Sequence, residues 1–169
     1  DDEGCSSLIF GVERSCFSVV ACLIDHGANV NAANKNGATA LFFASQEGHL
    51  ELVEYLIDHG AEVDASKDNG WTALFRASLF GCLEIIKCLV EHGANVNAVD
   101  IDGWTCLLVA CDKGHVEVVK YLMEHGATIH AFENHGWTAL MIACEAGMLE
   151  IVEALIERGA NVNTANRIG

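Results

Sequence analysis

One pattern of apolar and polar residues recurs along this chain every 33 residues. In its clearest copy, the apolar positions are spaced by three and four residues: Leu50, Val53, Leu56 and Ile57. This spacing predicts a helix with one apolar face that begins near Leu50. A shorter apolar stretch follows Thr39, whose hydroxyl can cap a first helix running to about Gln46. The pattern therefore predicts two helices in each unit.

Two series of glycines keep the same interval without an insertion. The first lies in Gly-Ala pairs at Gly27, Gly60, Gly93, Gly126 and Gly159, and the second is Gly4, Gly37, Gly70, Gly103, Gly136 and Gly169. Gly60 is expected to end its helix, because glycine enters the left-handed conformation without a Cβ penalty. Each unit is thus predicted to contain a turn, a helix, a second turn, a second helix and a hairpin.

Such units cannot bury their apolar faces alone, so neighbouring units must stack. Small residues at one position of the first helix would allow close approach: Gly11, Ala44, Ala77, Ala110 and Ala143. We predict a single domain over residues 1–169, with repeats at 1–33, 34–66, 67–99, 100–132 and 133–165, and with 166–169 as the start of a further repeat. The expected particle is elongated, with contacts between neighbours. We interpret the chain as a segment of a longer array or as an engineered array.

Three motifs at fixed offsets, Gly-x-Thr-x-Leu, Gly-His-x-Glu-x-Val and Gly-Ala-x-Val-Asn, resemble the ankyrin repeat family over residues 1–165. The resemblance implies an all-α ankyrin-repeat solenoid of stacked helix-turn-helix units with β-hairpin loops. One departure is the family's Thr-Pro-Leu-His box, which is Thr39-Ala40-Leu41-Phe42 in the second unit, and the chain has no proline. We expect larger apolar side chains to replace the hydrogen bonds of the missing histidine.

Composition excludes several classes of protein. Apolar residues make up 51% of the chain, which excludes a disordered chain, and no apolar run is long enough to span a membrane. The lack of such a run predicts no membrane insertion. The net charge of −15 would repel a phosphate backbone, so we expect no nucleic acid as a partner. A cytoplasmic location is expected, with the nucleus as the alternative. Six of the eight cysteines recur at matching positions, Cys16 with Cys82, Cys22 with Cys88 and Cys111 with Cys144, and the chain has no Cys-x-x-Cys motif. This favours reduced, buried structural thiols over a redox or disulfide role.

Candidate chemical sites follow the repeat rather than breaking it. His26, His59, His92 and His125 precede the Gly-Ala pairs, and units roughly 8–10 Å apart cannot bring them to one metal ion. An acidic series in the last turn of each second helix is either a solvated face or a docking strip for a basic partner: Asp25, Asp58, Glu91, Glu124 and Glu157. Because the motifs of common enzyme classes are lacking, we expect no enzyme, no cofactor, no metal site and no small-molecule substrate.

The three tryptophans, Trp71, Trp104 and Trp137, each follow the turn glycine of a unit. The resemblance implies that this position lies at the foot of the hairpin on the concave face and contacts partners. Leu79 and Phe80 close a first helix where the family usually has polar residues. The candidate partner-binding residues are Trp71, Leu79, Phe80, Ile101, Asp102, Trp104, Phe132 and Trp137. The alternative is that each indole packs against the next hairpin.

We therefore predict a protein-protein interaction module or scaffold whose partner is another protein with a basic or apolar face. A monomer is expected, with end-to-end association as the alternative. The rival function is a structural spacer, or a designed scaffold without a specific partner. The apolar residues Leu79 and Phe80 disfavour it, because a purely structural consensus would keep those positions polar. The resemblance also implies that Asn31, Asn97 and Asn163 match the motif modified by the asparaginyl hydroxylase that acts on ankyrin repeats.

Overall fold

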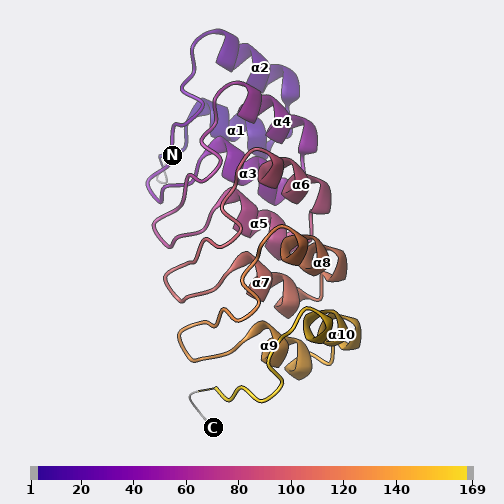
Figure 1. The fold of residues 1–169 in the computed structure, drawn as a ribbon. Coiled ribbons are helices and arrows are strands. Elements are labelled where there is room, and N and C mark those ends of the chain that lie inside the picture. The colour runs from indigo at the N-terminus through magenta and orange to yellow at the C-terminus, as the bar shows by residue number, and fades with distance from the viewer. Residues whose placement is uncertain (1–3, 167–169) are drawn as a thin grey trace.

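The computed structural model describes residues 4–166, and within that range the chain forms ten α-helices. They are α1 (Ser7–Glu13), α2 (Phe17–Asp25), α3 (Ala40–Glu47), α4 (Leu50–Asp58), α5 (Ala73–Phe80), α6 (Leu83–Glu91), α7 (Cys106–Lys113), α8 (Val116–Glu124), α9 (Ala139–Glu145) and α10 (Leu149–Glu157). Odd-numbered helices form an inner row and even-numbered helices an outer row (Figure 1). The predicted all-α solenoid is confirmed.

Side-chain caps begin the inner helices where the sequence predicts them. The hydroxyls of Thr39, Thr72, Thr105 and Thr138 accept hydrogen bonds of 3.2–3.4 Å from the backbone amide three residues further on. Each bond satisfies one of the amides that a helix N-terminus leaves without an intrahelical partner. At the other end of α4, Gly60 follows the last turn with φ +87°, as expected for a glycine that ends a helix.

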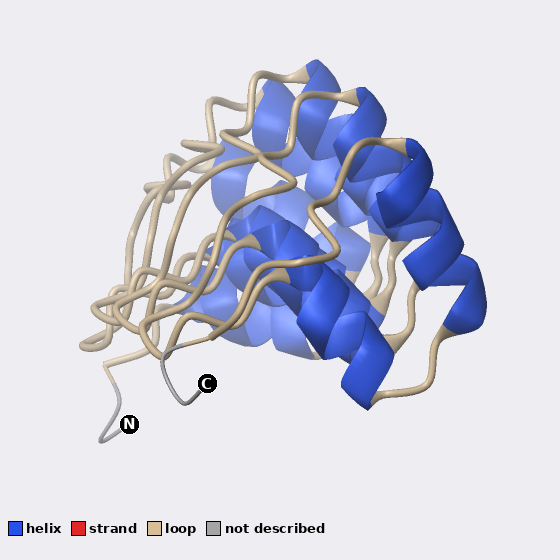
Figure 2. Cartoon of the chain, turned by 60° about the horizontal axis from the view of Figure 1, so that its bottom comes forward, coloured by secondary structure: helices blue, strands red, loops and turns tan. Residues whose placement is uncertain are grey.

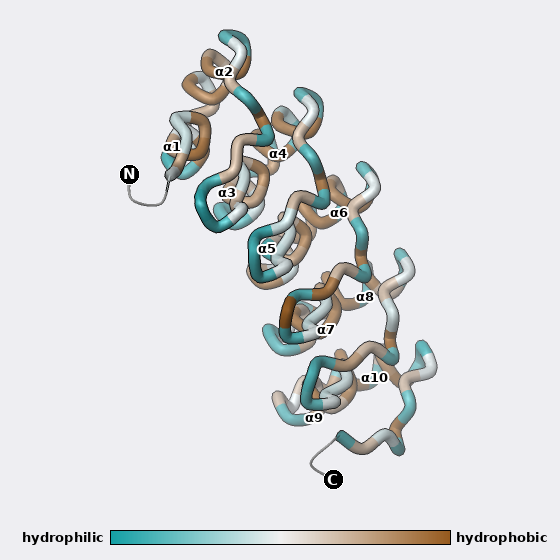
Figure 3. Tube along the Cα trace, turned by 90° about the vertical axis from the view of Figure 1, so that its left-hand side faces the viewer, coloured by the Kyte–Doolittle hydropathy of each residue, from teal (hydrophilic) through white to brown (hydrophobic). Residues whose placement is uncertain are grey.

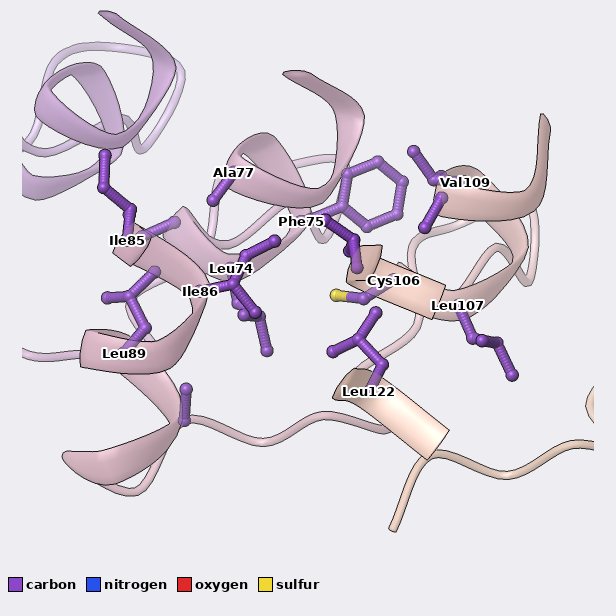
Figure 4. Close-up of a cluster of buried hydrophobic side chains, with 14 of the residues drawn as sticks. Leu74, Phe75, Ala77, Ile85, Ile86, Leu89, Cys106, Leu107, Val109 and Leu122 are labelled. Atoms are coloured by element: carbon purple, nitrogen blue, oxygen red, sulfur yellow. The ribbon is translucent and has the colours of Figure 1, made fainter. Parts of the chain in front are cut away.

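The core runs continuously between the two rows of helices. Each inner helix packs against the next one, and α4, α6, α8 and α10 pack in the same order in the outer row. The small residues Ala44, Ala77, Ala110 and Ala143 are fully buried in the inner row. Figure 4 shows side chains of α5, α6, α7 and α8 meeting in this core, with the ring of Phe75 pointing toward Val109. Neighbouring units therefore share one core, as predicted.

Apolar side chains occupy the position of the family's missing histidine. Phe42, Phe75 and Leu108 are buried there, and Met141 is half-buried. This confirms the expectation from the altered Thr-Pro-Leu-His box.

Extended hairpins leave the same side of the stack, opposite the outer helices (Figure 2). Antiparallel bridges join their two arms at Ser66 and Thr72, Val99 and Thr105, and Phe132 and Thr138. Successive hairpins approach closely: a Cβ atom on Gly70, where φ is +84°, would lie only 2.8 Å from Asp100 Cα. The glycine is required both by this contact and by its left-handed backbone.

Two asparagine side chains, Asn31 and Asn97, link neighbouring units through hydrogen bonds. The Asn97 amide donates to Gly126 O at 3.0 Å, and its carbonyl oxygen accepts from the Thr128 amide at 2.8 Å. Asn31 makes the same pair of bonds to Gly60 and Glu62. Two of the three asparagines considered as modification sites therefore hold adjacent units together.

The cysteines range from buried to exposed, with Cys5 and Cys82 half-buried. Cys88, Cys106 and Cys111 are buried, and burial raises the pKa of Cys106 and Cys111 to about 12. The expectation of buried thiols is wrong for Cys16, Cys22 and Cys144, which are exposed. Cys22 and Cys144 match Cys88 and Cys111 in register, but they lie in the first and last described units, where no further unit covers them.

The four histidines before the Gly-Ala pairs cap the outer helices. The Nδ1 atoms of His26, His59, His92 and His125 lie 2.7–2.8 Å from the carbonyl oxygen four residues earlier. The described residues contain no group of three or more His, Cys, Asp or Glu side chains arranged to hold a metal ion. None of the described helices has the length and apolar character needed to cross a membrane.

Candidate partner-binding surface

The Trp71 side chain is held on several sides by its own chain. Its indole stacks on Phe75 with ring centroids 5.0 Å apart, and its Nε1 donates a hydrogen bond of 3.1 Å to Asp100 Oδ2 in the next hairpin. The predicted packing alternative therefore describes Trp71 well, because its contacts come from its own helix and from the neighbouring hairpin.

Arg76 lies over the aromatic rings near Trp71. Its guanidinium carbon lies 4.8 Å from the ring centroid of Phe80, 5.4 Å from that of Trp71 and 5.5 Å from that of Phe42. One guanidinium nitrogen donates to Gln46 Oε1 in the preceding unit. Burial lowers the pKa of Arg76, with Glu47 acting in the opposite direction, and an arginine stays charged despite such a shift. This unit thus stabilises a half-buried cation with aromatic faces.

Trp104 stands between two hollows in the angle between the hairpins and the inner helices. The smaller hollow, of about 230 Å³, is lined by Trp71, Phe75, Leu79, Asp100, Asp102, Trp104, Val109, Asp112 and Lys113. The larger, of about 500 Å³, is lined by Asp102, Trp104, Asp112, Glu133, His135, Trp137, Ile142 and Glu145. Because Asp102, Trp104 and Asp112 line both, we treat the two hollows as one surface and call it the Trp104 groove.

Hydrogen bonds at the hairpin turns fix the backbone that carries these tryptophans. Asp100 Oδ1 accepts from the amides of Asp102 and Trp104 at 2.9 and 2.8 Å. Glu133 Oε1 accepts from the amides of His135 and Trp137 at 2.9 and 3.0 Å. Trp104 and Trp137 are consequently presented in the same way by successive hairpins.

The groove has a negative lining. Burial alone would raise the pKa of Glu133, but the backbone hydrogen bonds from His135 and Trp137 and the His135 side chain, 2.7 Å away, hold it below its ordinary value. Asp112 forms an ion pair of 2.7 Å with Lys113. Asp102 and Glu145 form no ion pair with any described residue. Two carboxylates therefore remain available beside the half-buried rings of Trp104 and Trp137.

The structure brings together most of the predicted partner-binding residues, but not all. Trp71, Leu79, Asp102 and Trp104 line the smaller hollow, and Trp137 joins Asp102 and Trp104 in the larger. Phe80, which is 50% exposed, adjoins them through Arg76.

Ile101 and Phe132 lie outside both hollows. Ile101 is 68% exposed on a hairpin whose tip is hydrophobic, whereas the tips before α3, α5 and α9 are hydrophilic (Figure 3). Phe132 lines a different hollow with Leu140 and Ala160. The two residues therefore do not extend the Trp104 groove.

Several groove residues were missing from the sequence prediction. Asp112 and Glu145 occupy the register position of Leu79, so the same positional argument identifies them. Arg76 carried a weaker signal: it is the one charged residue at a position that otherwise holds Phe43, Val109 and Ile142.

The acidic series of the outer helices forms a separate surface. A hollow of about 390 Å³ on this face is lined by Leu50, Glu54, Asp58, Glu84, Lys87, Cys88, Glu91 and His92. It lacks an aromatic wall of Phe, Tyr or Trp, so it differs chemically from the Trp104 groove.

Comparison with known proteins agrees with this geometry. The family model described as ankyrin repeats (3 copies) matches residues 8–100 and 93–166. A search of curated proteins finds no match to the chain. The matched regions span nearly all of the described helices, and their stacked helix pairs and hairpins have the architecture expected of those repeats. The chain therefore belongs to the ankyrin repeat family.

Proposed function

We propose that the Trp104 groove binds a segment of another protein with a basic or apolar face. Ankyrin repeats mediate protein-protein interaction, and the groove is where this chain combines half-buried aromatic rings with carboxylates. The observation that carries the proposal is the position of Trp104, which is half-buried and forms a wall of both hollows.

The physical basis is the usual composition of a binding surface. Aromatic anchors in partly enclosed pockets dominate interface energies, and polar groups around them exclude water and select the partner. Trp104 and Trp137 provide the aromatic surface, while Asp102 and Glu145 provide the negative rim. These carboxylates favour a basic partner and disfavour an acidic one.

The rival function, a spacer without a specific partner, is supported by the unbroken register and by the Asn31 and Asn97 links between units. A spacer needs only the shared core and these links. It gives no reason for a groove lined by tryptophans and carboxylates on the inner side.

Selection from a random peptide display library tests the proposal. Binders isolated with the unmodified protein should lose about 30-fold or more in affinity for a Trp104→Ala variant, corresponding to the roughly 2 kcal/mol of a hot spot. The matched control is Phe132→Ala, which removes an aromatic side chain that is 58% exposed outside the groove. This control should change the affinity less than about two-fold.

Circular dichroism melting must show that Trp104→Ala remains folded, and Trp104→Leu replaces it if it does not. The proposal is wrong if the selected peptides bind both groove variants and the control with the affinity of the unmodified protein. A library that yields no binder in repeated selections would favour the spacer function.

A further inference from the structure

We infer that the larger hollow of the Trp104 groove, between Trp104 and Trp137, is a binding pocket for an arginine side chain of the partner. This inference rests on the proposed protein-binding function and adds the chemistry of the recognised side chain. It follows from a comparison of successive units of the same chain, because one unit contains an arginine where the later ones contain the hollow.

Arg76 shows what the fold places beside these aromatic side chains. Its guanidinium lies over Trp71, Phe42 and Phe80 and donates to Gln46 of the preceding unit. A guanidinium suits such a position because it is planar, weakly hydrated and able to stack on rings while it donates hydrogen bonds at its edge. The chain itself thus places an arginine over aromatic rings at this position of the repeat.

The equivalent place in the fifth unit keeps the indole and a side-chain acceptor but lacks the cation. A shift by two repeat units takes Trp71 to Trp137, Arg76 to Ile142 and Gln46 to Asp112. Of the three rings around Arg76 only the indole is kept, since Leu108 and Ala146 replace Phe42 and Phe80, but Trp104 provides a second ring in the lining. The neutral acceptor becomes a carboxylate. Ile142 is too short to cover the indole as Arg76 does, and the hollow of about 500 Å³ lies there instead. Among the described residues, no Lys or Arg side chain lies over Trp104 or Trp137.

The charges of the larger hollow favour a cation from outside. Asp102 and Glu145 have no ion-pair partner in the described part of the chain, and Asp112 is paired only with the exposed Lys113. The one basic group in the lining, His135, is bound to Glu133. An arginine of the partner would stack on an indole and pair with these carboxylates, whereas a lysine offers a more hydrated ammonium that cannot stack.

The smaller hollow provides an internal contrast. Its lining combines Leu79 and Val109 with Lys113 and three carboxylates. Asp100 already accepts hydrogen bonds from Trp71 and Trp104, and Asp112 is paired with Lys113, which leaves Asp102, shared by both hollows, as its carboxylate without an ion pair. The preference for arginine is therefore specific to the larger hollow.

Nuclear magnetic resonance of the three indole N–H groups tests the inference. The probe is the acetylated and amidated peptide Gly-Gly-Arg-Gly-Gly, compared with peptides that carry citrulline, the neutral isostere, or lysine in place of arginine. We expect the arginine peptide to shift the Trp104 and Trp137 signals and to bind at least about five-fold more tightly than the citrulline peptide. The Trp71 signal should stay in place, because Arg76 already covers that ring.

A pair of charge variants separates the pocket from general attraction to an acidic protein. Asp112→Asn with Glu145→Gln should weaken the arginine peptide at least about five-fold. Asp58→Asn with Glu91→Gln removes the same charge from the outer face and should change the affinity less than about two-fold. Equal weakening by both pairs would overturn the inference.

Two further outcomes would overturn the arginine assignment while leaving the proposed function standing. The citrulline or lysine peptide could bind as tightly as the arginine peptide, or library-selected groove binders could shift the Trp104 and Trp137 signals while the arginine peptide does not. If neither the peptides nor any library binder shifts these signals, the proposed function fails as well.

Discussion

Trp71 Nε1 and Asp100 Oδ2 form a hydrogen bond of 3.1 Å between successive hairpins. The same carboxylate closes its own hairpin turn through Oδ1, which accepts the amide of Trp104 at 2.8 Å. Asp100 therefore ties the side chain of one tryptophan to the backbone of the next, and the shape of the groove depends on both.

This relationship predicts that Trp71→Phe lowers the free energy of unfolding by about 1 kcal/mol. Phenylalanine keeps the stacking on Phe75 but leaves Asp100 Oδ2 without its donor. Urea denaturation measures the loss. Trp137→Phe is the matched control, since its indole nitrogen has no hydrogen-bond partner among the described residues, and it should cost less than half as much. Equal losses would show that ring size, not the hydrogen bond, matters at Trp71.

The links between units predict a second loss of stability. Asn97→Ala removes two hydrogen bonds to the following unit and should lower the free energy of unfolding by about 1–2 kcal/mol. Asn163→Ala alters the equivalent asparagine of the last described unit, whose side chain makes no such link in the described range. This variant should change the free energy of unfolding by less than about 0.5 kcal/mol. Chemical denaturation of both variants checks this, and a larger effect of Asn163→Ala would contradict the assigned role.

The buried thiols predict a loss of stability in alkali. Burial raises the pKa of Cys106 and Cys111 to about 12 in the folded protein, whereas an unfolded cysteine ionises near pH ~8.5. Between these values the unfolded chain loses protons that the folded chain keeps. Stability should therefore fall as the pH rises, by up to about 1.4 kcal/mol per pH unit for each thiol.

Comparison of variants isolates that contribution from other groups that titrate in alkali. Cys106→Ala with Cys111→Ala should flatten the dependence of unfolding free energy on pH between about 9 and 11. Cys16→Ala with Cys144→Ala changes two exposed cysteines and should leave the slope as it is. Identical slopes for both double variants would rule out ionisation of the buried thiols as the cause.

The acidic rim predicts a kinetic effect on partner binding. Asp102→Asn should slow the association of a basic groove binder about two- to three-fold at low salt and leave its dissociation rate nearly unchanged, because exposed rim charges act mainly on encounter. Stopped-flow tryptophan fluorescence measures both rates. The difference should shrink as salt rises and screens the charge. An unchanged association rate would show that Asp102 does not contribute to the attraction of a basic partner.

Most of the fold could be predicted because its determinants are local. The caps at Thr39 and Thr72, the left-handed Gly60 and the apolar spacing of α4 each depend on a few neighbouring residues that recur in register. The exposure of Cys22 and Cys144 could not be obtained in this way. It depends on whether another unit covers the residue, and identical positions differ in that respect.

The candidate site was less predictable because its contacts cross between units. The regular spacing of the repeats places the tryptophans on successive hairpins, but it does not show that an arginine of the chain lies over Trp71 while no described Lys or Arg lies over Trp104 or Trp137. Arg76 decides this difference, and its contacts with Phe42 and Gln46 come from the preceding unit. Only the packing between units reveals which hollow the chain fills by itself.

The neighbour-only packing of the helices also has a mechanical consequence. Each repeat packs only against its neighbours, so the interfaces between repeats can deform independently of one another. The width of the larger hollow therefore depends on the single interface between the units of α7 and α9, which we call a joint. A ligand that touches both walls would stiffen this joint and leave the others as compliant as before. Amide exchange should then slow around residues 100–145 on binding, with little change near α1 and α2.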